Sequence, residues 1–215
     1  MRSLIIGMVL LAWGVLGLSG GLTLIPSDFA PAPGAQISLQ VSGAPAGAEF
    51  YWDFGGNGSV DQITQAPSIA YTVKAGYQEI VVQVHYQGQA VGSARIALSA
   101  DPSLGAYRTV HSRGAGPIEV TVVLHARAHL VAPGIEETIP PGWSLEVVDD
   151  GGALYKTGDV LQVVWPLELW PGDEVSLHYL LYPGEPASGR ISGIASAYGP
   201  DGRIEVRIGG VVIVP

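Results

Sequence analysis

Residues 49–61 read EFYWDFGGNGSVD, and this stretch decides the fold because an alternating apolar segment runs directly into a glycine-rich turn. Positions two apart lie on the same face of a β-strand, which groups Phe50, Trp52 and Phe54. Asn57 and Gly58 supply the positive φ angles that a tight turn needs. The stretch therefore predicts a strand with a core tryptophan, followed by a shaped turn.

The neighbouring sequence continues with short apolar segments separated by turn formers. Before the turn, AQISLQVSG places Ile37, Leu39 and Val41 on one face of a second strand. After it, residues 77–86 alternate, and the wholly apolar face is expected to be buried; its members are Ile80, Val82, Val84 and Tyr86. Strands at this spacing predict a sandwich of about seven strands between residues 22 and 100.

The motif YWDFGGNGSVD, followed by IAYTVKAGYQEIVVQV, resembles the PKD domain family. In that family a W-D-F-G sequence and a glycine-rich turn precede a hairpin with spaced tyrosine, glycine and valine residues. The matching residues here are Trp52–Gly55, Tyr71, Gly76 and Tyr77. The resemblance covers residues 22–100 and implies an immunoglobulin-like β-sandwich of the kind found in extracellular and cell-surface proteins.

Three oxygen-bearing side chains around this turn are candidate Ca²⁺ ligands: Asp53, Asn57 and Asp61. Calcium takes about six to eight oxygen ligands, but the Asp-x-Asp-x-Asp spacing of a calcium loop is absent. Asp53 alternates with Trp52, so its carboxylate points away from the core and can accept hydrogen bonds from N–H groups of the turn. A structural turn without a cofactor is the favoured interpretation, and Ca²⁺ binding is the alternative.

A second strand pattern begins at Asp101, and we expect residues 101–215 to form another immunoglobulin-like β-sandwich. Apolar residues alternate from Ile118 to Leu130, so one face of that segment is expected to be core. An E-x-x-P-x-G-W segment at 137–143 and a W-P-G segment at 170–172 are loosely similar to bacterial extracellular immunoglobulin-like domains. The terminal GGVVIVP is either the last strand or an exposed edge that pairs with another chain.

The N-terminus predicts an export signal. Arg2 precedes the apolar run Leu4–Leu18, and small residues stand before a cleavage site at Gly20. An uncleaved membrane anchor is the alternative, because the sequence remains nearly apolar to Pro26. We expect residues 1–19 to be a signal peptide and the protein to be secreted or held in the cell envelope, contacting a membrane only if this segment stays uncleaved.

Composition limits the function further. The 215 residues include 30 glycines and 16 prolines but no cysteine, so no disulfide or thiolate metal site can form. The formal net charge is −9 and the 10 basic residues are scattered, which argues against binding to nucleic acid. An exported protein without cysteine is more typical of a bacterial cell envelope than of a eukaryotic ectodomain.

Motifs that carry chemistry are absent from the sequence. It contains no nucleophile elbow, no phosphate-binding glycine loop and no H-E-x-x-H. Three sequential acid pairs lie in or beside expected turns, so we expect them to be solvated; these are Glu136-Glu137, Asp149-Asp150 and Asp173-Glu174. Neighbours on a strand point to opposite faces, so such a pair does not provide the two facing carboxylates of a glycoside hydrolase. We therefore expect a protein that is not an enzyme.

Aromatic side chains are the remaining candidates for a ligand site: Trp143, Trp165, Trp170 and Tyr198. If exposed on one sheet face, they would offer flat surfaces to sugar rings, although an aromatic residue is more often part of a core. The sequence predicts a structural or adhesive module that binds protein or polysaccharide at the cell surface. The alternative is a carbohydrate-binding accessory module that uses these aromatics.

Overall fold

The computed structural model describes residues 21–112, 116–185 and 189–214, and the expected export signal lies outside these ranges. Within them the protein is all-β, as the alternating patterns predict, and no residue is helical. This part of the chain consequently has no helix of the length and apolarity needed to cross a membrane.

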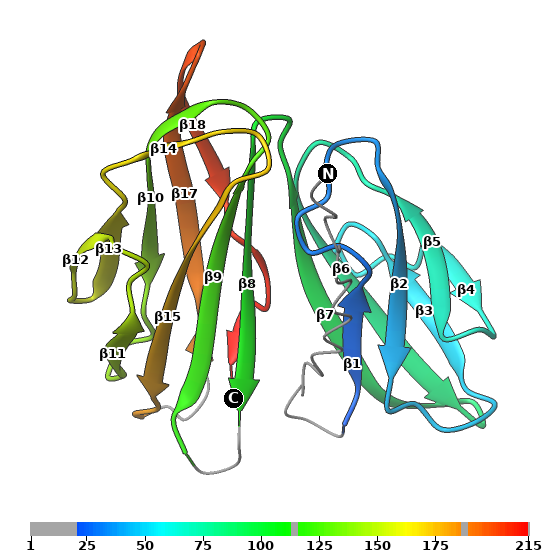
Figure 1. Cartoon of the computed structure of the whole chain (residues 1–215). Coiled ribbons are helices and arrows are strands. Elements are labelled where there is room, and N and C mark those ends of the chain that lie inside the picture. The colour runs from blue at the N-terminus through cyan, green and yellow to red at the C-terminus, as the bar shows by residue number, and fades with distance from the viewer. Residues whose placement is uncertain (1–20, 113–115, 186–188, 215) are drawn as a thin grey trace, which may run out of the picture.

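Residues 23–100 form two layers of antiparallel strands, which lie on the right in Figure 1. One layer has the order β1-β2-β5, and the other has the order β7-β6-β3-β4 within a larger nine-stranded sheet. The strands are β1 Thr23–Pro26, β2 Gln36–Ser42, β3 Glu49–Asp53, β4 Gln62–Thr64, β5 Ser68–Thr72, β6 Gly76–Tyr86 and β7 Gln89–Ala100. The layers enclose a core, which gives this half a β-sandwich character.

The core of this half contains most of the side chains that the alternation selects, but Phe54 and Tyr86, which were expected inside, are only partly buried. Buried residues come from β2, β3 and β6, in the order Ile37, Leu39, Val41, Phe50, Trp52, Ile80, Val82 and Val84. Trp52 is fully buried, and its indole N–H donates to Thr64 Oγ1 at 2.9 Å, so its single polar group is satisfied. The prediction of a core tryptophan beside a turn is confirmed.

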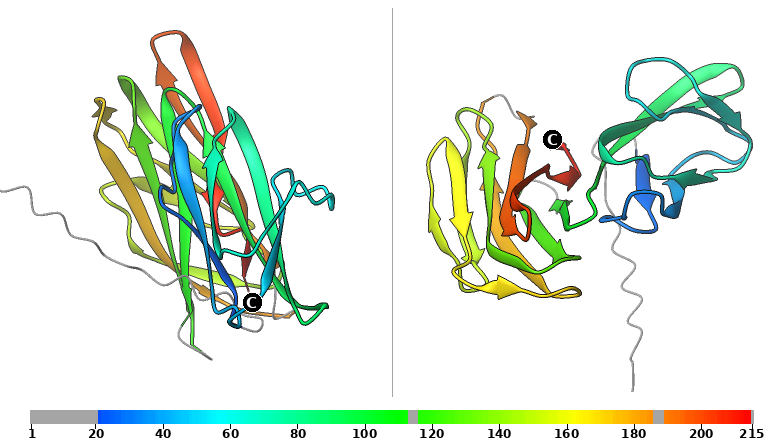
Figure 2. Two further views of the ribbon diagram at one scale, coloured as in Figure 1. Left: turned by 90° about the vertical axis from the view of Figure 1, so that its right-hand side faces the viewer. Right: turned by 90° about the horizontal axis from the view of Figure 1, so that it is seen from above.

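Residues 104–214 form the second half, again with two layers (Figure 2). One layer continues the nine-stranded sheet as β11-β15-β9-β8, and the other is a six-stranded sheet of order β12-β13-β10-β17-β18 with β14 beside β10. The strands are β8 Leu104–Ser112, β9 Ile118–Ala126, β10 Leu130–Thr138, β11 Ser144–Asp149, β12 Leu154–Lys156, β13 Val160–Val164, β14 Glu168–Leu169, β15 Glu174–Tyr182, β16 Gly189–Arg190, β17 Ser192–Gly199, β18 Gly202–Arg207, β19 Gly209–Gly210 and β20 Ile213–Val214.

A charged network lies inside this second core. Arg108 of β8 and Glu137 of β10 are both fully buried and form an ion pair. The Tyr179 hydroxyl donates to the other oxygen of Glu137, and Arg108 Nη1 donates to the Val211 carbonyl at 2.9 Å. The expectation that Glu137 is solvated is wrong, because the residue lies within β10 on the face that turns inward.

The terminal glycines do not form an exposed edge. Strand β19 pairs in parallel with β8 and antiparallel with β7, so it joins the two halves into one nine-stranded sheet. Gly210 has φ of 85°, and a Cβ at this position would lie 1.9 Å from the Arg108 carbonyl oxygen. Only glycine fits there, because both the backbone conformation and the space exclude a side chain.

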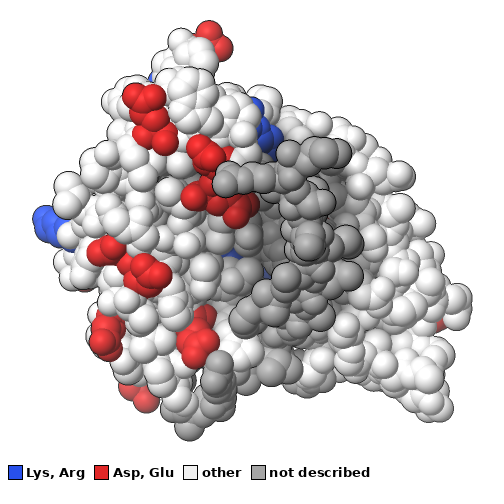
Figure 3. Space-filling view, viewed as in Figure 1, with Lys and Arg blue, Asp and Glu red and all other residues white. Residues whose placement is uncertain are grey.

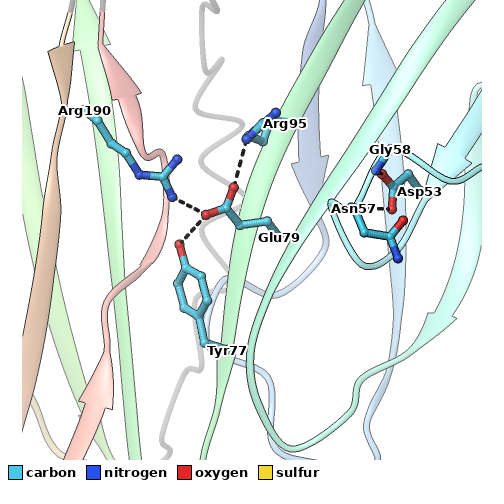
Figure 4. A network of polar contacts seen from close by, with 7 residues as sticks. All are labelled: Asp53, Asn57, Gly58, Tyr77, Glu79, Arg95 and Arg190. Carbon is cyan, nitrogen blue, oxygen red and sulfur yellow. Dashed lines mark hydrogen bonds and ion pairs between the residues drawn. The ribbon is translucent and has the colours of Figure 1, made fainter.

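Side-chain contacts also cross between the halves. Arg190 of β16 pairs with Glu79 of β6, which also binds Arg95 and accepts from Tyr77 (Figure 4). The Arg207 guanidinium lies 3.6 Å from the centre of the Tyr77 ring, within the range of a cation–π contact. The two halves are therefore held together by backbone pairing and by polar contacts.

Candidate functional site

The glycine-rich turn that opens the sequence places its acidic groups against its own backbone. Asp53 accepts N–H groups from Gly55 at 3.0 Å, Asn57 at 3.3 Å and Gly58 at 2.7 Å (Figure 4). Asp61 Oδ2 accepts the Phe54 N–H at 2.7 Å. These carboxylates organise the turn between β3 and β4. Its positive φ angles lie at Gly56 and Gly58, so the expectation of a positive φ at Gly58 is confirmed and that at Asn57 is wrong.

The electrostatics of Asp53 agree with that role. Burial raises the pKa of this carboxyl, but the backbone N–H groups of Gly58, Gly55 and Asn57 together lower it more, so the pKa lies below its ordinary value. The charged form is therefore stabilised by the turn itself. Across the described residues, no cluster of three His, Asp or Glu side chains is arranged to hold a metal ion.

The four candidate aromatics are not brought together. Trp165 is fully buried and its indole N–H donates to the Asp150 carbonyl at 3.0 Å, while Trp143 is 9% exposed and packs in the same core. Trp170 is 59% exposed and stacks on His129 at 4.3 Å. Tyr198 of β17 is 57% exposed. Only the last two therefore present ring surface to solvent.

A groove of 520 Å³ lies on the outer face of the six-stranded sheet, and Tyr198 lines it. Residues of β12, β13, β10, β17 and β18 contribute, in the order Leu154, Tyr155, Lys156, Gln162, Val163, Val164, Ala132, Gly134, Ile135, Glu136, Ser196, Tyr198 and Arg203. Several of these apolar side chains are exposed, with Leu154 at 66%, Tyr155 at 48% and Val164 at 40%. Its exposed apolar side chains beside polar groups make this groove a candidate binding site.

The strand register explains why this face is hollowed. Val164, Gly134 and Ser196 are direct neighbours across β13, β10 and β17. The side chains of Val164 and Ser196 point outward, because their strand neighbours Val163 and Ala195 are buried, whereas Gly134 has no side chain and is itself buried. Gly134 has no side chain and Ser196 has a small one, so the sheet surface at this row lies below the larger side chains of the neighbouring rows. The row therefore forms the floor of a trough that runs across the strands.

The two walls of the trough differ in chemistry. On one side Gln162 and Glu136 are register partners, and the Gln162 amide donates to Glu136 Oε1 at 3.4 Å. On the other side Tyr198 pairs with Arg203, whose guanidinium lies 2.7 Å from Glu205 Oε1. One wall thus offers amide and carboxylate groups, and the other offers an aromatic ring beside a cation.

An irregularity in β10 shapes the second wall. The register between β10 and β17 shifts between Val131 and Gly134, and Ala132 within this shift has φ of 49°. Such bulges re-aim neighbouring side chains, and a positive φ at a non-glycine residue is strained. The distortion lies where Ala132 lines the groove beside Tyr198.

The sequence patterns identify one residue of this groove in advance, Tyr198. The others were missed because they look like ordinary outward positions of amphipathic strands. Gly134 carries a usable signal, since a glycine inside a strand marks a bulge or a close approach to another group. The groove also depends on strands that are distant in sequence and are brought together only by the sheet order.

Charge is unevenly distributed on the face of the molecule drawn in Figure 3. Asp and Glu side chains gather over the second half, on the left, whereas the first half is almost uncharged there. Near the groove the charges balance, because Lys156 and Arg203 are opposed by Glu136 and Glu205. The groove is therefore locally close to neutral.

The chemical groups that line the groove are mainly apolar and hydrogen-bonding. Among the described residues that line the groove, Glu136 is the one carboxylate, and no histidine lies beside Ser196 to activate it. Glycoside hydrolysis needs two carboxyl groups on opposite sides of the scissile bond, and a serine nucleophile needs an adjacent base. What the arrangement provides is a set of hydrogen-bonding groups and an aromatic surface.

Comparison with known proteins gives no family. No family model matches the chain, and no curated protein matches it. Many solved structures share weak similarity with this chain, and three of them serve as examples. Chitinase ChiA74 from Bacillus thuringiensis has 12% identity and a TM-score of 0.37 over 89% of this chain, and the match spans 27% of the chitinase chain.

Two further examples span most of both chains. One is a structure reported as manganese lipoxygenase of Gaeumannomyces graminis with part of zonadhesin of Komagataella pastoris, at 9% identity, a TM-score of 0.41 and coverage of 89% and 93%. The other is the yeast delta-COP-I mu-homology domain, at 10% identity, a TM-score of 0.33 and coverage of 87% and 92%. Similarities this weak indicate no function.

Proposed function

We propose that this protein is an exported, non-catalytic interaction module of the cell envelope that binds a protein or polysaccharide through the groove on its six-stranded sheet. The observation that carries the proposal is the groove itself, where the exposed side chains of Leu154, Val164 and Tyr198 lie beside polar groups. Binding sites are typically concave, mostly apolar and supplied with a few polar groups that orient the ligand.

The proposed organisation is a PKD-like unit at residues 22–100 followed by an immunoglobulin-like unit at residues 101–215. The W-D-F-G motif at Trp52–Gly55 supports the first assignment, and the separate hydrophobic cores of the two halves support the division. In this account the first unit acts as a rigid spacer that carries the groove of the second unit away from the point of attachment. Secretion or retention in the envelope follows from the export signal proposed at residues 1–19.

Carbohydrate binding is a second candidate, favoured by the exposed ring of Tyr198 in the groove wall. A flat row of four aromatics is not available for it, because Trp143 and Trp165 lie in the core. A saccharide would therefore depend on the groove and not on an aromatic platform.

The proposal is tested by comparing two valine-to-lysine variants. Val164→Lys puts a long charged side chain into the groove, whereas Val148→Lys changes a comparably exposed valine on β11 that lies outside it. Binding of the mature chain to envelope fragments and surface proteins is measured by surface plasmon resonance. We expect Val164→Lys to weaken saturable binding about tenfold or more and Val148→Lys to leave it unchanged.

Two results would contradict this function. Turnover of any polysaccharide or peptide in a substrate panel, lost in the Val164→Lys variant, would make the groove an active site. Equal binding by the wild type and both variants would place the interaction elsewhere on the molecule.

A further inference from the structure

We infer that the groove takes a neutral oligosaccharide that lies across the strands, with a sugar ring against Tyr198 and hydroxyl groups directed at Gln162 and Glu136. The inference rests on the proposed function and names the ligand class for the same site. It follows from the direction of the groove, the hydrogen-bonding groups of its walls and its balance of charge.

The direction of the groove limits how a ligand can be held. Strands β13, β10 and β17 are central in the sheet, so their backbone N–H and C=O groups are already paired on both sides. An extended peptide gains much of its affinity by adding a strand to a sheet edge, and the edge strands β12 and β18 lie only at the two ends of the groove. A ligand in the groove is therefore bound by side chains and not by backbone pairing. This favours a ligand that carries hydrogen-bonding groups along its own length.

The length of the trough suits a chain of sugar rings. It crosses the five strands from β12 to β18, and neighbouring strands are about 4.8 Å apart, so it is about 19 Å long. Its floor at Val164, Gly134 and Ser196 lies between the wall at Gln162 and the wall at Tyr198. This shape fits a short linear ligand better than a compact one.

The walls match the two kinds of surface on a sugar ring. A hydroxyl group both donates and accepts, and the wall formed by Gln162 and Glu136 provides an amide donor with carbonyl and carboxylate acceptors. A sugar ring also has an apolar face of C–H groups, and the exposed Tyr198 ring on the other wall offers a flat surface for it. Ser196 on the floor adds a further hydroxyl between the walls.

The charge of the groove favours a neutral saccharide. Arg203 is paired with Glu205 at 2.7 Å, and Lys156 stands across β13 from Glu136, with Gln162 between them as register partner of both. Neither an anionic nor a cationic ligand would find an excess of opposite charge. Uronate-containing or sulfated glycans would leave carboxylate or sulfate groups beside Glu136.

The test is isothermal titration calorimetry of the purified mature chain with cello-, xylo-, manno- and chito-oligosaccharides, and with polygalacturonate fragments as acidic probes. We expect saturable binding of at least one neutral probe. Tyr198→Ala and Gln162→Ala should each weaken it about tenfold. Tyr182→Ala is the matched control, because Tyr182 is an exposed tyrosine on β15, outside the groove, and should leave affinity unchanged.

The outcomes separate this inference from the proposed function. Neutral-saccharide binding that Tyr198→Ala does not weaken, or binding of the acidic probe alone, would overturn the inference. Absence of any saccharide binding, with a peptide from a random library bound and lost in the Tyr198→Ala variant, would overturn the saccharide but keep the groove as a binding site. If neither saccharides nor peptides bind, and the Val164→Lys variant binds envelope fragments as well as the wild type does, both the saccharide inference and the proposed function would be overturned.

Discussion

At the scale of single residues, the core of the second half contains a buried positive charge, Arg108, that is neutralised by a buried carboxylate. Arg108 is fully buried, and Glu137 and Tyr179 surround its guanidinium with an ion pair and a hydroxyl. Burial raises the pKa of Tyr179 well above its ordinary value, and the neighbouring Glu137 raises it further, so the phenol stays protonated and continues to donate. A buried pair of this kind is costly to break from one side.

Glu137→Gln leaves the Arg108 guanidinium buried without its counter-charge. We expect a loss of about 3–5 kcal/mol in the free energy of unfolding, measured by urea denaturation. The adjacent Glu136 is exposed, so Glu136→Gln is the control and should change the free energy by less than about 0.5 kcal/mol. Similar losses in both variants would mean that the buried pair has no special role.

At the scale of elements, the short strand β19 has an effect out of proportion to its length. It occupies the position between β7 and β8, where Val211 N–H also donates to the Arg108 carbonyl at 3.1 Å. Its flanking residues Ile208 and Val212 are 2% and 4% exposed. Residues 208–212 therefore fill the seam between the two halves, and their backbone pairs with β7 on one side and β8 on the other.

Gly210→Ala should disrupt the pairing of β19 with β7 and β8. The new Cβ would lie 1.9 Å from the Arg108 carbonyl oxygen at a φ of 85°, and we expect a loss of about 2–5 kcal/mol with faster amide exchange in β7 and β8. Gly88→Ala is the control, because Gly88 has φ of 76° but nothing within 4 Å of the added Cβ. It should cost only about 1–2 kcal/mol. Equal costs would show that β19 tolerates a side chain.

At the scale of the whole molecule, the two halves are also joined by partly exposed charges. Glu79 accepts from Arg190 across the seam and from Arg95 within its own half (Figure 4). Burial raises the pKa of Glu79, but Arg190 and Arg95 lower it more, so the pKa lies below its ordinary value. The lowered pKa means that the folded protein favours the ionised form.

The contribution of Glu79 to stability should depend on pH. A carboxyl whose pKa is lowered by folding stabilises the protein above its unfolded pKa of about 4.3, and the contribution is lost as the pH falls through the lower folded value. Arg190 is 44% exposed at its side chain, so we expect only about 1 kcal/mol or less. The difference in unfolding free energy between wild type and Glu79→Gln should be present at pH 7 and vanish in acid.

Glu205→Gln is the control for that experiment. Glu205 pairs with Arg203 within one hairpin, and both side chains are more than half exposed. This variant should give little difference at any pH. A Glu79→Gln effect that persists in acid would mean that the side chain acts through packing and not through its charge.

The amino-acid sequence alone determined the strands of this protein and their inward faces. Alternation two residues apart selected Phe50 and Trp52 in one half and Ile118 to Ala126 in the other, because an apolar residue at every second position can be buried only by a strand. The expected continuation to Leu130 is wrong, because β9 ends at Ala126 and Leu130 begins β10 in the other sheet. The same alternation does not carry the order of strands in a sheet. It therefore could not show that Gly134, Val164 and Ser196 lie in one row.

Only the tertiary structure decided which side chains form the groove and which lie in the core. Trp165 and Tyr198 are equally plausible as exposed aromatics in sequence, yet one is fully buried and the other is 57% exposed. Glu136 and Glu137 are adjacent acids, and neighbours on a strand face opposite sides, so one lines the groove and the other holds Arg108. Burial is set by the layer that packs against each face, and that layer comes from residues far away in the chain.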